Sequence, residues 1–444
     1  MPLADLSKDN PDIEFNDDFV RAMALLEDGS SHVFIKGRAG TGKSTFLNLC
    51  RTNLKKNMVV LAPTGAAAVN VGGQTIHSFF NFKPNITVKG VSSVSIRPEY
   101  AKVYTRLEMI VIDEVSMVRA DLLDCVDAFL RLHGPDPTKA FGGVVMVFIG
   151  DLYQLPPVVT SSDEYIFHMH YRSPFFFDAR VFEEINIRVV EFEKNYRQQD
   201  KTFQQMLEAI RHNRVSDEHL RLLNARYDPL FDPPEDDNWV YLTTTNKIAD
   251  DINQERLKAL KEDLFTHDGK VRGNFEKVTL PTHEVLDLKV GAQVIMLNND
   301  REGRWVNGTI GRIKEIYNAG FNAAAVQVVL PDGKSIEVEP YTWEMFEFYY
   351  NGEKGTIDSR VTGSFKQFPM KLAWAITIHK SQGKTFEKIA IDVGKGAFCH
   401  GQIYVALSRC TTLEGIVLKN KITSSDLYLD GNIQRFLDKY SKKW

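Results

Sequence analysis

The segment from residue 37 to 44, GRAGTGKS, has the GxxxxGK[ST] spacing of a phosphate-binding loop. A strand-like run, HVFIK, precedes it and a helix-like run, STFLNLCRTNL, follows it, which is the context that such a loop needs. Glycines let backbone N–H groups close around phosphate oxygens, and the helix start adds the positive end of its dipole. We therefore expect a nucleotide here, with Lys43 neutralising phosphate charge. The expected contacts are Gly37, Ala39, Gly40, Thr41, Gly42, Lys43 and Ser44.

Two carboxylates, Asp113 and Glu114, end the apolar run MIVI at 109–112. They should emerge at the carboxyl edge of a parallel sheet, where α/β proteins bind ligands. Asp113, together with the Ser44 hydroxyl, suits Mg²⁺, and Glu114 suits a general base for an attacking water. After the next apolar run, GDLYQLPPV places Gln154 where its amide could donate to a γ-phosphate. Taken singly, these residues are also typical of a helix start or a proline-stiffened turn, but with the loop they indicate a nucleotide hydrolase.

The second half of the chain carries two polar segments, TIHKSQGKTF at 377–386 and YVALSRCT at 404–411. An arginine on such a segment, facing the first half across a cleft, could reach the γ-phosphate as an arginine finger. Arg409 is one candidate and Arg197 in KNYRQQ is a second, although a single arginine is more often a solvated surface residue. The nearest match to a guanine-binding NKxD motif, NKIA at 246–249, has Ala at the Asp position, so ATP is the expected nucleotide.

The elements that must position these residues follow from hydrophobic patterning. Continuous β-branched runs at 32–37, 58–65, 109–114 and 144–151 predict parallel strands covered on both faces by helices, which is an α/β fold. A second series begins after the strand-like run at 187–192, with further runs at 239–246 and 390–394. Short β-rich stretches cut by NG, AG and DG turns predict a small barrel. We expect a first domain at 1–192 with a protruding loop or hairpin at about 66–102, a second at 193–289 and 361–444 with a helical tail from about 420, and the barrel at 290–360.

Composition limits what the chain could be. Its 444 residues are 43% hydrophobic and 25% charged, which is ordinary for globular proteins of more than one domain. Every apolar run is shorter than the roughly 20 residues of a membrane span, the start does not resemble a signal peptide, and the four cysteines form no CxxC pair. We therefore expect a cytoplasmic protein with no membrane partner. The net charge of −4 gives no overall basic field, so any nucleic-acid binding would depend on local grooves.

Seven segments follow one another along the chain in this order: GRAGTGKS, APTGAAAVNVGGQTIHSFF, VIDEVSM, GDLYQLPPV, NYRQ, TIHKSQGKTF and YVALSRCT. With them, residues 30 to 412 resemble superfamily 1 helicases of the RecD-related branch that moves 5′-to-3′. DLLDCVDAFLRLHGPDPTKAFGGVVMVFIGDLYQLPPV resembles the signature region of the Pif (petite integration frequency) helicases, and LKVGAQVIMLNND with VNGTIGRI resembles their SH3-like barrel. The resemblance implies two RecA-like P-loop NTPase domains with ATP between them, and a compact bacterial, nucleoid-associated member.

The resemblance also implies roles for individual residues. Lys43, Ser44 and Thr45 would hold nucleotide and Mg²⁺, Asp113 and Glu114 would do metal and base work, and Gln154, Arg197 and Arg409 would sense the γ-phosphate. DNA contacts would fall on Thr64, His77, His379 and Lys380, with Gly383 beside the nucleotide. The aromatic rings of Phe79, Phe80 and Phe82 offer stacking faces for bases or, equally, a small core. The family's adenine-reading Gln before the loop is missing here, and the Asn16 amide is the candidate substitute.

The function that the resemblance implies is ATP-driven, 5′-to-3′ movement on single-stranded DNA by a monomer that unwinds forked or 5′-tailed duplex DNA and G-quadruplexes. Repair, recombination or telomere maintenance would be its cellular setting. Two alternatives remain open: a P-loop switch or binding module that moves no strand, and a motor that acts mainly on RNA–DNA hybrids.

Overall fold

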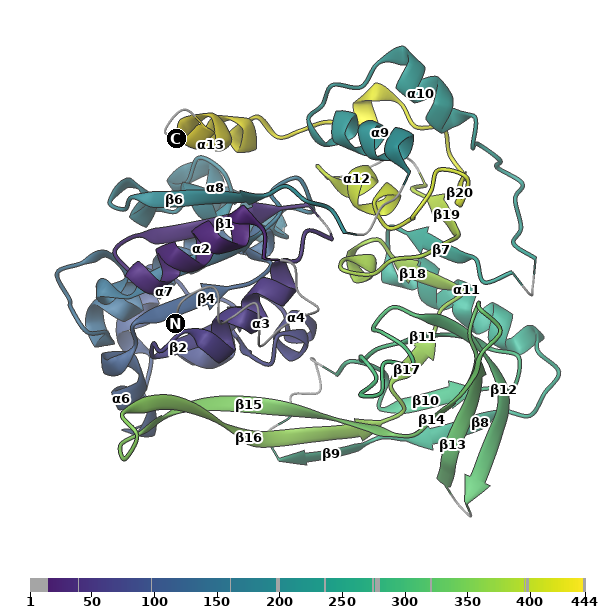
Figure 1. Ribbon diagram of the computed structural model, residues 1–444, viewed down its shortest axis with the longest axis horizontal. Helices are drawn as coiled ribbons and strands as arrows, with labels where there is room; N and C mark the ends of the chain where they lie inside the picture. The colour runs from purple at the N-terminus through teal and green to yellow at the C-terminus, as the bar shows by residue number, and fades with distance from the viewer. Residues whose placement is uncertain are drawn as a thin grey trace.

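The computed structural model describes residues 15–38, 40–96, 98–159, 161–196, 200–234, 237–273, 275, 280–319, 322–394, 396 and 399–441. The first half of the chain forms a six-stranded sheet in the order β3-β2-β4-β5-β1-β6, in which all neighbours run parallel (Figure 1). Its strands are β1 (His32–Gly37), β2 (Met58–Ala62), β3 (Gln74–Thr75), β4 (Met109–Ile112), β5 (Val145–Gly150) and β6 (Ile187–Phe192).

The continuous apolar runs are explained by burial on both faces of this sheet. Within β1, Val33 and Ile35 pack into one core cluster and Phe34 packs into another on the opposite face. Parallel strands joined through helices require this two-sided burial. The α/β prediction is therefore confirmed. The helices of this half are α2 (Asp17–Asp28), α3 (Lys43–Asn53), α4 (Gly65–Asn70), α5 (Ile76–Phe80), α6 (Pro98–Arg106), α7 (Ala120–His133) and α8 (Ser161–His170).

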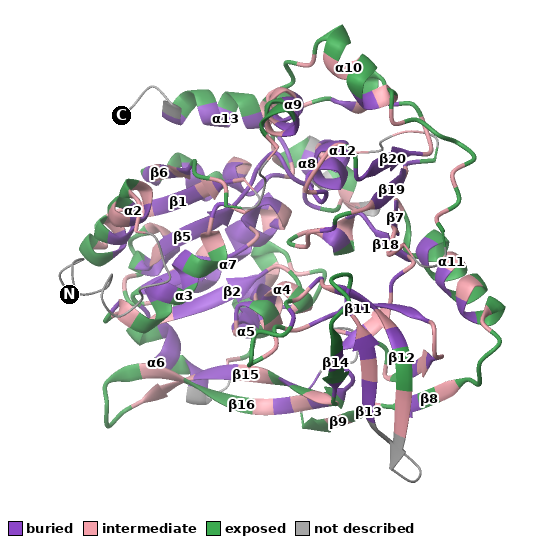
Figure 2. Ribbon diagram, turned by 45° about the vertical axis from the view of Figure 1, so that its right-hand side comes forward, coloured by how far each residue is buried: buried purple, intermediate pink, exposed green. Residues whose placement is uncertain are grey.

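The second half contains a four-stranded parallel sheet in the order β18-β7-β19-β20. Its strands are β7 (Val240–Thr243), β18 (Ala375–Thr377), β19 (Ile389–Asp392) and β20 (Ile416–Leu418), and its helices are α9 (Lys201–Arg211), α10 (Asp217–Asn224), α11 (Asn246–Ala259) and α12 (Gln402–Leu407). The outer faces of α10 and α11 are exposed, whereas the strands are mostly buried (Figure 2).

The C-terminal helix α13 (Gly431–Ser441) packs on the first half, although the sequence placed this tail with the second domain. Phe436 stacks on Phe177 with ring centroids 4.4 Å apart, and Arg435 pairs with Asp178 at 2.7 Å. Figure 1 shows α13 lying beside β6 and α8. The apolar stripe of α13 thus completes the core of the first sheet.

A β-rich module is inserted in the second half, as expected, but its strands extend beyond 290–360. A five-stranded sheet has the order β14-β13-β12-β11-β17, and its core runs from Leu257 to Met370. The expected end at residue 360 falls inside β16, because β15 and β16 form one long hairpin with β9 alongside. The strands of the module are β8 (Phe265–Asp268), β9 (Lys270–Gly273), β10 (Val285–Leu288), β11 (Gln293–Met296), β12 (Ile310–Ala319), β13 (Asn322–Val329), β14 (Ser335–Val338), β15 (Tyr341–Asn351), β16 (Thr356–Gln367) and β17 (Met370–Leu372). An SH3-like barrel topology stays a prediction.

The segment expected as a loop or hairpin at 66–102 is built instead from short helices. Besides α4, α5 and the start of α6, it contains the two-residue strand β3 and a 3₁₀ turn at Val88–Ser93. Phe79, Phe80 and Phe82 are buried there and pack with Tyr104 and Phe129. These three rings are therefore core residues, and the alternative of exposed stacking faces was wrong.

No helix in the part of the chain that the structure describes is long and apolar enough to span a membrane.

Candidate nucleotide site between the two sheets

The loop from Gly37 to Ser44 leaves β1 and enters α3 in the predicted geometry. Gly40 and Gly42 have left-handed backbones, with φ of 84° and 83°, and a Cβ on Gly42 would lie 2.9 Å from the Phe19 ring. Gly42 immediately precedes α3, and among the described residues no side chain caps this helix. Its first N–H groups are thus available to an anion. Ala39 lies outside the described residues.

Lys43 is folded onto the loop that precedes it. Its Nζ donates to the carbonyls of Gly37 at 2.7 Å and Arg38 at 2.8 Å. Burial lowers the pKa of Lys43, and the charges of Asp151, Glu114 and Asp113 oppose this shift. Three carboxylates therefore stabilise the charged form of the Lys43 ammonium. Thr41 is buried with its hydroxyl donating to Arg38, whereas Ser44 and Thr45 are exposed on the first turn of α3.

Asp113 and Glu114 follow β4 at the carboxyl edge of the sheet, as predicted. The Asp113 amide continues the ladder by donating to Leu61 at 2.9 Å, whereas Glu114 turns away with a left-handed backbone at φ 49°. A non-glycine residue in this region carries a strain of about 1 kcal/mol or more, which the surrounding fold must impose. Burial raises the pKa of Asp113, and burial with the neighbouring Asp113 charge raises the pKa of Glu114 to about 7.

The second half reaches this site through Arg409. This arginine is fully buried, and its guanidinium donates to the Val405 carbonyl at 2.9 Å and to the Ser408 hydroxyl at 2.7 Å. Its Nη1 also donates to the carbonyls of Ser381 and Lys384, both at 3.4 Å, so the TIHKSQGKTF segment holds it in place. The positive charge of Arg409 lowers the pKa of Glu114, so a cation of the second half acts electrostatically on a carboxylate of the first.

The turn that carries Gln154 contacts the second half of the chain. Gln154 donates to Asp151 at 3.2 Å, and its carbonyl oxygen Oε1 accepts from Gln382 at 3.5 Å. A Cβ on Gly401, which precedes α12, would lie 2.5 Å from the Tyr153 carbonyl oxygen. Only glycine permits this close approach. His400 also meets the Leu152 carbonyl at 3.0 Å, so α12 begins directly against the turn.

Arg211 is a site residue that the sequence reasoning missed. It ends α9, is 4% exposed, and approaches Asp151 at 3.4 Å and Glu191 at 3.6 Å, with its guanidinium 4.2 Å from the centre of the Tyr153 ring. Its charge also lowers the pKa of Lys43. The apolar periodicity of Phe203, Met206, Leu207 and Ile210 marked α9 as a packed helix, but no motif distinguished the arginine that follows.

The candidate nucleic-acid residues occupy equivalent places in the two halves. Thr64 follows β2 and caps α4, where its hydroxyl accepts from Ala67 at 3.3 Å, and it is exposed. His379 and Lys380 follow β18 in the 3₁₀ turn His379–Ser381, with Lys380 exposed and His379 half-buried. His77 lies half-buried on α5. Gly383 lies two residues after this turn, with φ 76°. Arg197 lies outside the described residues.

The Asn16 side chain makes structural hydrogen bonds. Its side chain accepts from the Phe19 amide at 2.9 Å and thereby caps α2, while its Nδ2 donates to the Tyr196 hydroxyl at 3.3 Å. The Tyr196 amide in turn donates to Gly40 at 3.0 Å. Asn16 thus lies near the loop, but an adenine would have to compete for its amide.

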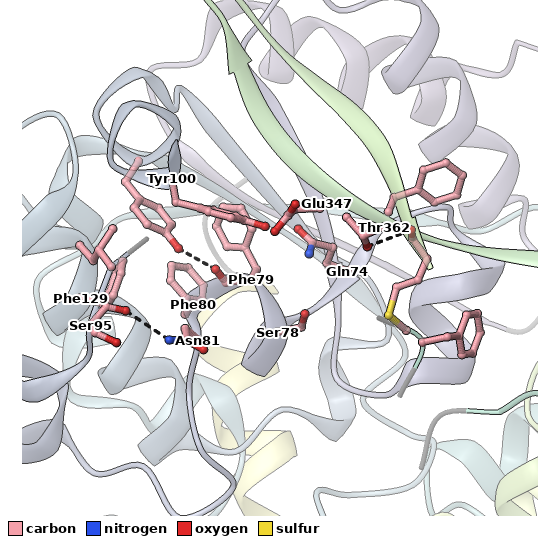
Figure 3. A pocket seen from close by; sticks show the side chains of 15 residues that line it. Gln74, Ser78, Phe79, Phe80, Asn81, Ser95, Tyr100, Phe129, Glu347 and Thr362 are labelled. Carbon is pink, nitrogen blue, oxygen red and sulfur yellow. Dashed lines mark hydrogen bonds between the residues drawn. The ribbon is translucent and has the colours of Figure 1, made fainter. Parts of the chain in front are cut away.

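A cavity of about 380 Å³ lies away from this loop, and Figure 3 shows the side chains that line it. It lies between α5, α6 and the β15–β16 hairpin, and Gln74, Ser78, Asn81 and Glu347 are among its lining residues. Two of its hydrogen bonds, Tyr104 to the Phe79 carbonyl at 2.6 Å and Asn81 to the Ser95 carbonyl at 3.2 Å, lie within the first half. This cavity holds none of the candidate catalytic side chains.

Comparisons with known proteins identify the family of the chain. A model of the PIF1-like helicase family matches residues 18–221. ATP-dependent DNA helicase Pif1 of Campylobacter jejuni is 30% identical over 92% of this chain and 95% of its own length. A crystal structure of Bacteroides sp Pif1 in complex with ADP-AlF4 is 35% identical, with a TM-score of 0.88 over 97% of this chain and 98% of that one. The Bacteroides Pif1 structure bound to ssDNA, at 34% identity and the same coverage, has a TM-score of 0.66.

Proposed function

Because the chain belongs to the PIF1-like helicase family, we propose that it hydrolyses ATP to move 5′-to-3′ along single-stranded DNA and to unwind duplexes ahead of it. The observation that carries the proposal is the shared site: Lys43 and Glu114 come from one sheet domain, and Arg409 comes from the other. A site divided in this way couples the state of the nucleotide to the relative position of the two domains.

The residues divide the chemistry as follows. The amides of the loop and the ammonium of Lys43 bind the phosphates, and Lys43 must leave the carbonyls of Gly37 and Arg38 to do so. Glu114 accepts a proton from the attacking water, and Arg409 stabilises charge that develops on the γ-phosphate. Gln154 reports the γ-phosphate to the second domain through its contact with Gln382.

Magnesium fits the oxygen donors at this site. Mg²⁺ is usually held by one or two protein ligands together with substrate phosphates and water. Asp113 and Ser44 are the residues that would hold it, and it would neutralise charge on the β- and γ-phosphates. No cluster of three or more His, Cys, Asp or Glu side chains suited to a metal occurs among the described residues, so the ion would depend on the nucleotide.

Single-stranded DNA is the proposed track. Thr64 and His77 would contact its phosphates in the first domain, and His379 and Lys380 would do so in the second, since hydroxyl, imidazole and ammonium groups bind phosphates without reading sequence. Forked and 5′-tailed duplexes are the proposed substrates, and G-quadruplexes are a further one. The Pif1 of Bacteroides has been solved with ssDNA, which supports this choice of ligand.

The test compares unwinding of 5′-tailed DNA, 3′-tailed DNA and a 5′-tailed RNA–DNA hybrid of the same sequence, with Lys43→Ala as the inactive control. The proposal expects ATP-dependent unwinding of the 5′-tailed DNA and none of the 3′-tailed DNA. Faster unwinding of the hybrid would favour the RNA–DNA alternative. An ATPase that single-stranded DNA does not stimulate would favour a nucleotide switch and overturn the proposal.

A further inference from the structure

A second pocket, of about 300 Å³, lies in the second half between α11, β10, β17 and β18. Its wall contains no residue of the phosphate-binding loop. It combines two lysines, Lys371 and Lys380, with the hydroxyl of Thr377 and the amides of Asn246 and Gln254. Ile376 and Leu286 supply apolar surface. Such a wall offers several hydrogen-bond donors around a cation pair.

Lys371 is the unusual member of this wall. It is the central residue of β17, paired with Ile295 of β11, and its neighbour Met370 belongs to the core of the β-rich module. A lysine with a largely buried stem needs an anionic or hydrogen-bonding partner for its ammonium. Among the residues that the structure describes, no hydrogen bond or ion pair satisfies the Lys371 ammonium.

Positive charge accumulates around this lysine. Burial, together with the positive charges of Lys380 and Lys384, lowers the pKa of Lys371 to about 7, and Asp250 opposes the shift. Lys384 donates to Asn307 at 2.6 Å, and burial lowers its pKa to about 8. Within the described part of the chain none of the three ammonium groups makes an ion pair. An anion in the pocket would relieve their repulsion and restore their charge.

The wall favours a phosphate over other occupants. Two acidic side chains, Asp250 and Asp287, also line the pocket, but the lysines would repel a divalent cation held by them. An apolar ligand would leave the ammonium groups unpaired. Lys380 adjoins His379, and both follow β18 at the edge where the proposed strand lies. A strand of DNA that follows this edge would therefore carry one of its backbone phosphates into the pocket.

We propose that this pocket is a subsite for one backbone phosphate of the translocated single strand, bound by the ammonium groups of Lys371 and Lys380. The inference rests on the proposed function, because it assigns a further contact to the same strand. It adds Lys371, a residue outside the TIHKSQGKTF segment, to the DNA-binding surface of the second domain. The amides of Asn246 and Gln254 complete the donor set.

The experiment measures binding of a fluorescent oligo-dT to the full chain at several salt concentrations. Lys371→Met keeps the length and apolar stem of the side chain but removes its charge. It should weaken binding about tenfold and reduce the slope of log K against log salt by about 0.7, the value for one phosphate contact on a single strand. Lys371→Arg should keep the slope. Lys334→Met, which removes an exposed lysine paired with Asp332 in the same module, is the matched control and should match the wild type.

A second measurement tests the contact if Lys371→Met lowers the melting temperature. A series of oligonucleotides, each with one neutral methylphosphonate at a different position, replaces the backbone phosphates one at a time. At one position the wild type should lose affinity, whereas Lys371→Gln should bind that oligonucleotide as well as it binds the unmodified one. Equal losses of affinity at every position would overturn the inference. Inorganic phosphate that displaced the strand at a concentration equal to that of the strand's own phosphates would also overturn it, because the pocket would then be a small-anion site. If the wild type bound no strand at all, the proposed function would fail instead.

Discussion

At the scale of single residues, Asp113 and Glu114 are neighbours with different environments. The backbone of Asp113 continues the sheet, whereas Glu114 makes a left-handed turn, and the charges of Lys43 and Arg409 lower its pKa against the larger effect of burial. We predict that Glu114→Gln binds ATP within a few-fold of the wild type but hydrolyses it about 10²- to 10⁴-fold more slowly, because only proton acceptance is lost. A fluorescent nucleotide titration and a steady-state ATPase assay measure the two effects. Glu218→Gln, on the exposed face of α10, is the control, and rapid turnover by Glu114→Gln would reassign the base.

Arg409 is held by acceptors that match the fork of a guanidinium. Lysine has a single point charge and cannot donate to Val405, Ser408 and Ser381 together. We predict that Arg409→Lys lowers kcat by roughly 10³-fold, the cost of losing an arginine finger, while nucleotide binding changes little. Because Arg409 is fully buried, melting temperatures with and without nucleotide must accompany the kinetics. Arg256→Lys, at a surface pair with Asp232, controls for the substitution itself, and an unchanged kcat would remove Arg409 from the reaction.

At the scale of elements, β1 and β5 are joined by a side chain as well as by their ladder. His32 opens β1, and its Nδ1 accepts from the Met146 amide of β5 at 3.0 Å. Burial lowers the pKa of His32 to about 4, so the folded state keeps this ring neutral. As pH falls below 6.5, His32 binds a proton in the unfolded chain but not in the folded protein. Because the unfolded state binds more protons, the free energy of unfolding decreases. This contribution is complete above pH 6.5 and is lost progressively towards pH 4.

We predict that His32 alone removes about 2 kcal/mol of stability between pH 6.5 and pH 5, at 1.36 kcal/mol for each pH unit. In His32→Asn an amide oxygen replaces Nδ1 as the acceptor without titrating. Urea denaturation of both proteins across this range measures the effect as the difference between their pH profiles. The variant should show the shallower profile, and parallel profiles would mean that the folded state accepts the proton.

Elements with continuous apolarity could be predicted from the sequence, and elements defined by long-range contacts could not. The strands β1, β2, β4 and β5 lie where their β-branched runs indicated, and so Lys43, Asp113 and Gln154 fall at one sheet edge. The hairpin β15–β16 crosses the expected limit at residue 360, because β16 continues to pair with β15 beyond it and also pairs with β9, far earlier in the chain. Arg211 escaped notice for the same reason: its function depends on Asp151, sixty residues away and in the other half.

At the scale of the whole molecule, the described residues of the second half contact the first in several places. One is the nucleotide site, another is α13 against the turn at Phe176–Asp178, and another is the hydrogen bond from Asn307 to Asn70 at 3.3 Å. A further contact is the β15–β16 hairpin along the lower edge of the first sheet domain (Figure 1). The hairpin contact combines polar contacts with apolar packing, since Phe348 is buried with its ring centroid 6.1 Å from that of Phe79. The Ile357 amide donates to Asn57 at 3.0 Å, the Phe348 amide donates to Gln74 at 3.4 Å, and Arg106 lies 5.9 Å from the Tyr350 ring. Contacts between domains of one chain commonly rearrange, so this contact is a candidate for opening.

The Bacteroides structures differ in how well they superpose on this chain. The one with ADP-AlF4 superposes on this chain far better than the one with ssDNA, at nearly equal identity, so bound strand accompanies a different arrangement of the same parts. We predict that saturating oligo-dT raises hydrogen exchange at the Ile357 and Phe348 amides at least tenfold, while amides of α13 keep their protection. Mass spectrometry of exchanged peptides resolves the two regions. Continued protection of both hairpin amides in the complex would show that the hairpin stays docked.

The same arrangement predicts the effect of weakening the docked form. Asn57→Ala removes the acceptor for the Ile357 amide, and one such hydrogen bond contributes about 1 kcal/mol. If the strand binds only after the hairpin leaves, the variant should bind oligo-dT up to about fivefold more tightly, because a larger fraction of the free protein is competent. Asn48→Ala, on α3, provides the matched control. Weaker binding by Asn57→Ala would instead mean that the docked hairpin belongs to the form that holds the strand.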